Sequence, residues 1–196
     1  MREKLISHAR GSCMREELII RHCSPTLAGI KTGSLFNCSY ENEEMLYDDL
    51  RALNKNLMPR GVRILPVRYY GNRALIYLYR PERLSLDLSD NDALALLKAR
   101  GYHCSCTDQY VIQLMKRLKA SEEFPHEIGL FLGYPPSDVK GFIDNHGKAC
   151  KYSGCWKVYS DEQSACRLFE KYRRCTEIYC LKCAQGVSID RLTVAR

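Results

Sequence analysis

An amphipathic helix near the C-terminal end is the longest regular pattern in the chain, and it constrains the fold more than any other feature. Between about Asp161 and Ala184, apolar residues recur along one stripe at about 100° per residue, and charged residues occupy the opposite side. The stripe consists of Ala165, Leu168, Phe169, Tyr172, Thr176, Tyr179, Cys180 and Cys183. This pattern predicts a helix that packs through one face and ends at Gly186.

The remaining patterns predict shorter helices and a few strands. Apolar spacing and turn residues favour helices at about 14–22, 41–57, 90–100, 108–120, 127–132 and 135–143. The first of these should end at Cys23-Ser24-Pro25, because a residue before proline avoids the helical region. A β-hairpin is expected at about 62–80 around Gly71-Asn72, and a further strand at about 155–159. We therefore predict an α+β fold with a small, mainly antiparallel sheet, covered by several helices including the long C-terminal one.

The length and the hydropathy pattern predict one domain outside the membrane. A chain of 196 residues fits a single domain, and no stretch approaches the roughly 20 apolar residues of a membrane span. No apolar signal-peptide region follows the charged N-terminus, so we expect a cytoplasmic protein. We expect residues 14–196 to form the domain and residues 1–13 to be an N-terminal extension, with Met14 as a candidate true start.

Eleven cysteines are the unusual feature of the composition. Without an export signal, reduced thiols are the expected state, and free cysteine is common in protein cores. One set has the close pairs that a structural zinc site uses: Cys150 with Cys155, and Cys180 with Cys183. Zinc or iron is therefore the cofactor hypothesis. The alternative, which we favour, is core packing, because the second pair lies on the apolar helix stripe.

Two short motifs contain residues that could take part in catalysis. His22-Cys23 could form a thiolate–imidazole pair, although a turn at the end of a helix explains the same residues. His126-Glu127 lacks the second histidine of a zinc protease, since residue 130 is leucine. Glu127 could still act as a partly buried acid or base, and the simpler interpretation is a carboxylate that caps a helix.

The predicted hairpin is strongly basic. Residues 51–83 contain eight basic residues and one acid. The resulting charge of this segment, +7, equals the net charge of the whole chain. Arginines that alternate with aromatic residues can hold single-stranded nucleic acid or an acidic protein partner. The candidate contact residues are Arg63, Arg68, Arg73, Tyr77, Tyr79 and Arg80. The alternative, which we favour, is a half-buried sheet whose tyrosines pack beneath helices.

Three segments of the chain resemble a known family. They are residues 21–31 (RHCSPTLAGIK), 124–142 (FPHEIGLFLGYPPSDVKGF) and 154–159 (GCWKVY). Together they resemble the bacterial family called domain of unknown function 3793, found mainly in anaerobic Firmicutes. The resemblance carries no established activity, fold or catalytic residues. It implies iron or electron-transfer physiology, because genes of the family tend to lie near those for flavodoxin and ferrous-iron uptake.

These observations lead to three hypotheses of different classes. The first is a non-enzymatic, thiol-rich accessory protein of iron or redox metabolism, which handles a metal or docks to a small acidic redox protein such as a flavodoxin. The second is a nucleic-acid-binding module that uses the basic hairpin. The third is an enzyme with a site around His126 and Glu127, joined by Cys23. We rank them in this order.

Overall fold

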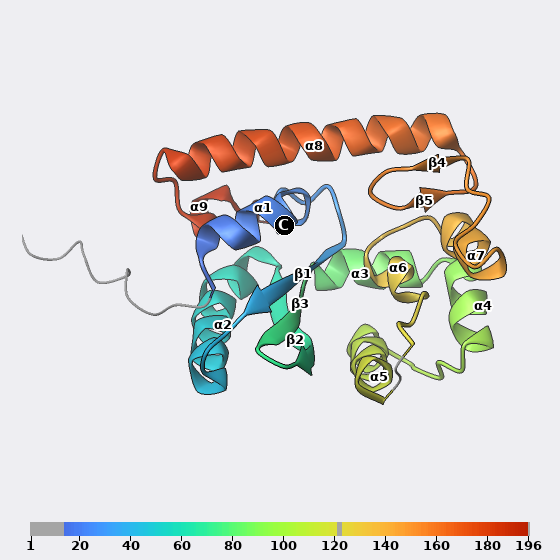
Figure 1. The fold of residues 1–196 in the computed structure, drawn as a ribbon, viewed down its shortest axis with the longest axis horizontal. Helices are drawn as coiled ribbons and strands as arrows, with labels where there is room; N and C mark the ends of the chain where they lie inside the picture. Colours follow the sequence, from blue (N-terminus) through green and yellow to red (C-terminus); the bar gives the residue numbers. More distant parts are fainter. Residues whose placement is uncertain (1–13, 121–122, 196) are drawn as a thin grey trace, which may run out of the picture.

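The computed structural model describes residues 14–120 and 123–195, and it shows the predicted α+β architecture (Figure 1). A small antiparallel sheet lies near the centre, helices surround it, and a long helix runs along one side of the molecule. The predicted extension at residues 1–13 lies outside the described residues. Within the described part of the chain, no helix is long and apolar enough to cross a membrane.

The central sheet has three strands in the order β1-β3-β2, all antiparallel. These are β1 (Gly33–Ser39), β2 (Arg63–Tyr70) and β3 (Arg73–Tyr79). The predicted hairpin of β2 and β3 is confirmed, with Gly71 at a positive φ of 52° in its turn. The central strand β3 is buried on both faces: Ile76 and Leu78 pack into one core, and Tyr77 and Tyr79 into the other.

Helices cover both faces of this sheet. They are α1 (Glu16–Leu27), α2 (Glu43–Leu57), α3 (Pro81–Leu88), α4 (Asn91–Ala99), α5 (Thr107–Ala120), α6 (Ile128–Phe131), α7 (Pro136–Asp144), α8 (Glu162–Ala184) and α9 (Ile189–Leu192), with a 3₁₀ turn, η1 (Met58–Arg60). Side-chain caps mark the starts of three helices, because Asn42, Asp90 and Asp161 accept bonds from the first free backbone N–H groups of α2, α4 and α8.

One expected helix end was wrong, and one helix was missed. The first helix does not end at Cys23-Ser24-Pro25 but continues to Leu27, with Pro25 in its last turns. A proline inside a helix costs about 3 kcal/mol. Residues 23–27 are all buried, and the packing of this segment offsets the cost. Helix α3, from Pro81 to Leu88, was not expected at all.

The predicted strand at 155–159 was also assigned to the wrong sheet. Its residues Lys157–Val158 form β5, which pairs with β4 (Tyr152–Ser153) in a separate two-stranded hairpin. The third strand of the central sheet is β1 instead. A strand of two residues is too short to show an alternating pattern, so the sequence does not indicate which strand it pairs with.

Helix α8 packs as its stripe predicted. Figure 1 shows it along the outer side of the molecule, with α1 and α9 near one end and the β4–β5 hairpin near the other. Ala165 and Tyr172 are buried against the hairpin, while Tyr179, Cys180 and Cys183 pack toward the core beneath α1. The helix therefore joins the two ends of the fold.

Candidate functional site

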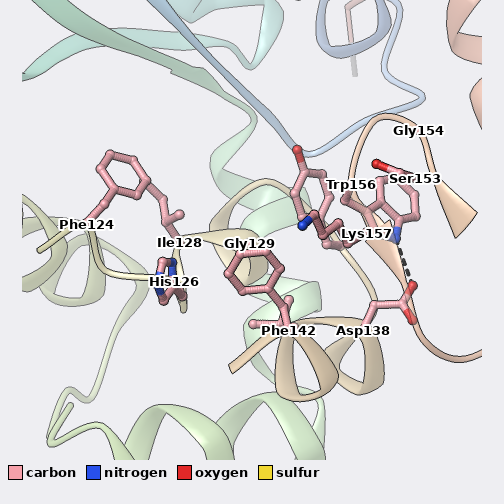
Figure 2. Close-up of a pocket in the computed structure, with 12 residues that line it drawn as sticks. Phe124, His126, Ile128, Gly129, Asp138, Phe142, Ser153, Gly154, Trp156 and Lys157 are labelled. Atoms are coloured by element: carbon pink, nitrogen blue, oxygen red, sulfur yellow. Dashed lines mark hydrogen bonds between the residues drawn. The ribbon is translucent and has the colours of Figure 1, made fainter. Parts of the chain in front are cut away.

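A cavity of about 310 Å³ opens between the 124–142 segment and the β4–β5 hairpin. Its walls are mainly aromatic, from Phe124, Tyr134, Phe142 and Trp156. Figure 2 shows Phe124 and His126 on one side of this aromatic pocket and Trp156 on the other, with Phe142 between them. Residues about 30 positions apart in the sequence thus enclose one space.

Close backbone packing lets the walls of the aromatic pocket approach each other. A Cβ atom on Gly129 would lie 2.7 Å from the Val139 side chain, so α6 and α7 can pack closely only because residue 129 is glycine. Likewise, a Cβ atom on Gly154 would lie 2.3 Å from the Phe169 ring. This glycine lets the hairpin turn lie directly on α8.

A buried carboxylate positions Trp156. The Asp138 side chain is 1% exposed, and its Oδ2 accepts a hydrogen bond from the indole Nε1–H at 2.7 Å. Its Oδ1 accepts the backbone N–H groups of Tyr159 and Ser160 at 2.8 Å and the Ser160 hydroxyl at 2.7 Å. Burial alone would raise the pKa of Asp138, but these hydrogen bonds more than offset it and hold the pKa below its ordinary value. Asp138 is therefore an ionised anchor between α7 and β5.

Aromatic contacts fix the indole on its other sides. The Trp156 ring stacks on Tyr134 with centroids 4.7 Å apart and meets the edge of Phe169 at 4.5 Å. The Tyr134 hydroxyl donates to the carbonyl of Cys155 at 3.3 Å, which ties the same turn to the loop after α6. The aromatic wall is consequently held in place before any ligand arrives.

Two polar side chains border the aromatic pocket. The Lys157 ammonium donates to the carbonyl of Gly147 at 2.5 Å and lies 5.9 Å from the centroid of the Phe142 ring. The His126 ring meets Phe142 at 4.9 Å, edge to face. Asp138 already accepts bonds on both of its oxygens, so Lys157 is the charged group of this lining with donor capacity left for a ligand.

The structure separates His126 from Glu127. His126 lines the pocket, whereas the Glu127 carboxylate points into the core, where it accepts the Tyr102 hydroxyl at 3.2 Å and Arg117 Nη1 at 3.4 Å. The Arg117 guanidinium also lies over the Tyr102 ring at 4.6 Å. Glu127 makes no capping hydrogen bond to α6, so the capping interpretation was wrong as well. His126 and Glu127, the two residues of the predicted enzyme site, therefore do not line the same pocket.

His22 and Cys23 do not form a reactive pair. The Cys23 thiol is fully buried, and burial raises its pKa far above the ordinary value, so it stays protonated. The His22 ring stacks on Phe36 with centroids 5.7 Å apart. Burial, and then the charge of Arg21, lower the pKa of His22.

The exposure of the thiols makes a labelling prediction. Iodoacetamide added to the folded protein should alkylate the exposed Cys106 and Cys155 at least about tenfold faster than the buried Cys23 and Cys38. Peptide mass spectrometry after short labelling times measures the order in which the cysteines are alkylated. Early modification of Cys23 would contradict its buried position, and the unfolded protein, in which all thiols are accessible, is the control.

The cysteines predicted as metal ligands are spread over different elements. Cys150 precedes β4, Cys155 lies in the hairpin turn, and Cys180 and Cys183 lie on α8. Among the described residues, no group of three or more histidine, cysteine, aspartate or glutamate side chains is arranged to hold a metal ion. The arrangement of these residues therefore offers no support for a zinc or iron site.

The basic hairpin loses part of its predicted surface. Tyr77 and Tyr79 are buried core residues, and the Tyr77 hydroxyl donates to the carbonyl of Phe131. Arg80 is 3% exposed and donates to backbone carbonyls. Arg63 pairs with Asp108 at 3.1 Å. Three of the six candidates thus lie in the core, whereas Arg73 is exposed and Arg68 is half-buried.

Sequence reasoning missed the aromatic residues of the pocket. Tyr134, Phe142 and Trp156 lie inside the segments quoted for the family resemblance, but their spacing alone gave no sign that they enclose a cavity. The signal available was that residues 124–142 combine aromatic residues with glycine and proline, and that residues 154–159 combine them with glycine.

The comparisons with known proteins give one match. The model of a family described as "Protein of unknown function (DUF3793)" matches residues 19–193. No curated protein matches the chain, and no solved structure does.

Proposed function

The chain belongs to the DUF3793 family, and for this member we propose a binding function: the aromatic pocket takes a small planar aromatic molecule without chemical conversion. The observation that supports the proposal is the pocket itself. A largely apolar cavity with a few polar groups at its border is the usual form of a small-molecule site. Its volume of about 310 Å³ suits a ligand of one or two rings.

The lining indicates the chemistry of the ligand. The rings of Phe124, Phe142 and Trp156 offer faces and edges on which a planar ring can stack. At the border, the ammonium of Lys157 can donate to a carbonyl, carboxylate or ring nitrogen of the ligand. We therefore expect an aromatic or heteroaromatic molecule with an acceptor or anionic substituent.

Binding rather than catalysis fits the placement of the titratable groups. His126 borders the cavity, but Glu127 is turned into the core. Acid–base catalysis that used both His126 and Glu127 would need each group within reach of the same substrate. A ligand-binding role agrees with an accessory protein of redox metabolism. That role, and docking to a small acidic carrier such as flavodoxin or to nucleic acid, stay predictions.

The test of the binding function uses the single tryptophan of the chain as a reporter. Ligand-observed NMR with a set of small aromatic acids and ring-matched saturated analogues should show binding of the aromatic members only. Their titration should change the fluorescence of Trp156, because the indole forms one wall of the pocket. Binding that is equal for aromatic and saturated analogues would contradict the proposal.

A pair of aromatic substitutions localises the binding. Phe142→Ala removes one wall and should weaken the affinity about three- to tenfold, the size of one aromatic contact. Tyr152→Ala is the matched control, because Tyr152 lies on the same hairpin but stacks on Phe169 outside the pocket. An equal loss of affinity in both variants would place the ligand elsewhere.

A further inference from the structure

A second cavity, of about 470 Å³, lies between α8 and the chain after α1. It shares no lining residue with the aromatic pocket, although both border the β4–β5 turn: Gly154 and Trp156 line the first, and Cys155 lines the second. The charged or titratable residues around it are His22, Lys31, Cys155, Tyr172, Arg173, Glu177 and Cys180.

Lys31 is held at this second cavity by its backbone and by aromatic rings. The backbone N–H of Lys31 donates to the carbonyl of Pro25 at 3.1 Å, at the end of α1. The half-buried side chain places the ammonium 5.5 Å from the centroid of Tyr134 and 6.0 Å from that of Tyr172. Burial lowers the pKa of this lysine.

The charge of Lys31 lacks a partner within the described part of the chain. None of the ion pairs or hydrogen bonds found there involves its ammonium. Glu177, the carboxylate in the lining, accepts from Arg173 at 2.6 Å. His22, which also lines the cavity, cannot supply a negative charge, because an imidazole is either neutral or cationic. A partly desolvated ammonium next to an open cavity is unusual, since such groups are normally paired.

We propose that this cavity is an oxyanion site, in which the Lys31 ammonium binds the phosphate or carboxylate group of a small molecule. The oxyanion supplies the counter-charge and the hydrogen-bond acceptors that the protein does not supply. The rings of Tyr134 and Tyr172 hold the ammonium at the cavity, and they leave its N–H groups free to donate. This site does not depend on the aromatic ligand proposed above, because the two cavities are separate.

The first test is thermal unfolding in inorganic phosphate or in acetate, with chloride keeping the ionic strength constant. At about ten times the dissociation constant, a bound oxyanion should raise the Tm of the wild-type protein by about 3–6 °C. Lys31→Met, which keeps an aliphatic stem, should show no rise. Without oxyanion, its Tm should equal or exceed that of the wild type. Lys171→Met is the matched control and should keep the full rise, because Lys171 is exposed on α8 and lines neither cavity.

The second test needs no substitution. Reductive methylation near neutral pH followed by peptide mass spectrometry reports how accessible each amine is. Under the same conditions, a bound oxyanion should slow methylation of Lys31 about tenfold and leave that of the exposed Lys171 unchanged. Protection by phosphate alone would assign a phosphate group, and protection by acetate alone a carboxylate. Protection of Lys31 by neither ion, or an equal Tm rise in wild type and Lys31→Met, would overturn the proposal.

Discussion

Replacing Arg80 with methionine should lower the free energy of unfolding by about 3–5 kcal/mol. The guanidinium is buried and donates to the carbonyls of Thr26 and Leu27 at 2.7 Å, of Val194 at 2.8 Å and of Arg60 at 3.3 Å. It joins the end of β3 to the end of α1, to η1 and to the C-terminal segment. Methionine fills much of the volume but leaves the carbonyls of the buried Thr26 and Leu27 without this charged donor.

Urea denaturation of both proteins measures this difference, with Arg73→Met as the control. Arg73 belongs to the same basic hairpin but is exposed, so its replacement should change stability by less than about 0.5 kcal/mol. The two variants also distinguish a structural role of Arg80 from a role in binding nucleic acid. If Arg80→Met left the stability unchanged and abolished binding to single-stranded nucleic acid, Arg80 would be a surface contact and its buried role would be wrong.

Replacing Asp138 with asparagine should lower the free energy of unfolding by about 2–4 kcal/mol and disturb the aromatic pocket. Asparagine keeps the shape, but it presents an amide NH₂ where the carboxylate accepts N–H groups. With Oδ1 still facing the backbone of Tyr159 and Ser160, the NH₂ faces the indole N–H of Trp156, and two donors meet. Urea denaturation measures the stability, and Trp156 fluorescence reports the displacement of the indole.

The dependence on pH provides a second readout for Asp138. The folded pKa of Asp138 is depressed, so its contribution to stability is full above the ordinary value of 3.8 and disappears as the pH falls through the folded pKa. The loss of stability between wild type and Asp138→Asn should therefore shrink at strongly acidic pH. Asp144→Asn is the control, because that exposed pair with Lys140 should contribute less than about 1 kcal/mol. A constant difference at all pH values would show that the charge of Asp138 is not what stabilises the hairpin.

The helices with clear periodicity could be predicted because local spacing determines which face is apolar. The apolar stripe of α8 and the spacing of α2 and α5 indicated helices that the structure confirms within a few residues at each end. The β2–β3 hairpin was predictable for a similar reason, since its turn residues and its strands are adjacent in the sequence. These features depend on interactions over a few residues, which the order of amino acids states directly.

The choice of strand partners depended on contacts between distant residues. Gly33–Ser39 pairs with β3 and adds a third strand to the sheet between the two cores. No pattern in its seven residues indicates that it pairs with β3. Pro25 stays in a helix because its neighbours are buried, which outweighs its local preference. Tyr77, Tyr79 and Arg80 look the same in sequence whether they face a ligand or the core.

The amphipathic helices, the hairpin and the α+β class could all be inferred from the sequence, because each follows from the local spacing of apolar and turn residues. Which polar groups meet depended on how these elements pack together. It brought Asp138 beneath Trp156, turned Glu127 away from His126, and left the Lys31 ammonium beside an open cavity. The interaction energies of these polar groups come from burial and from partners far apart in the chain, and both are defined only once the elements have packed.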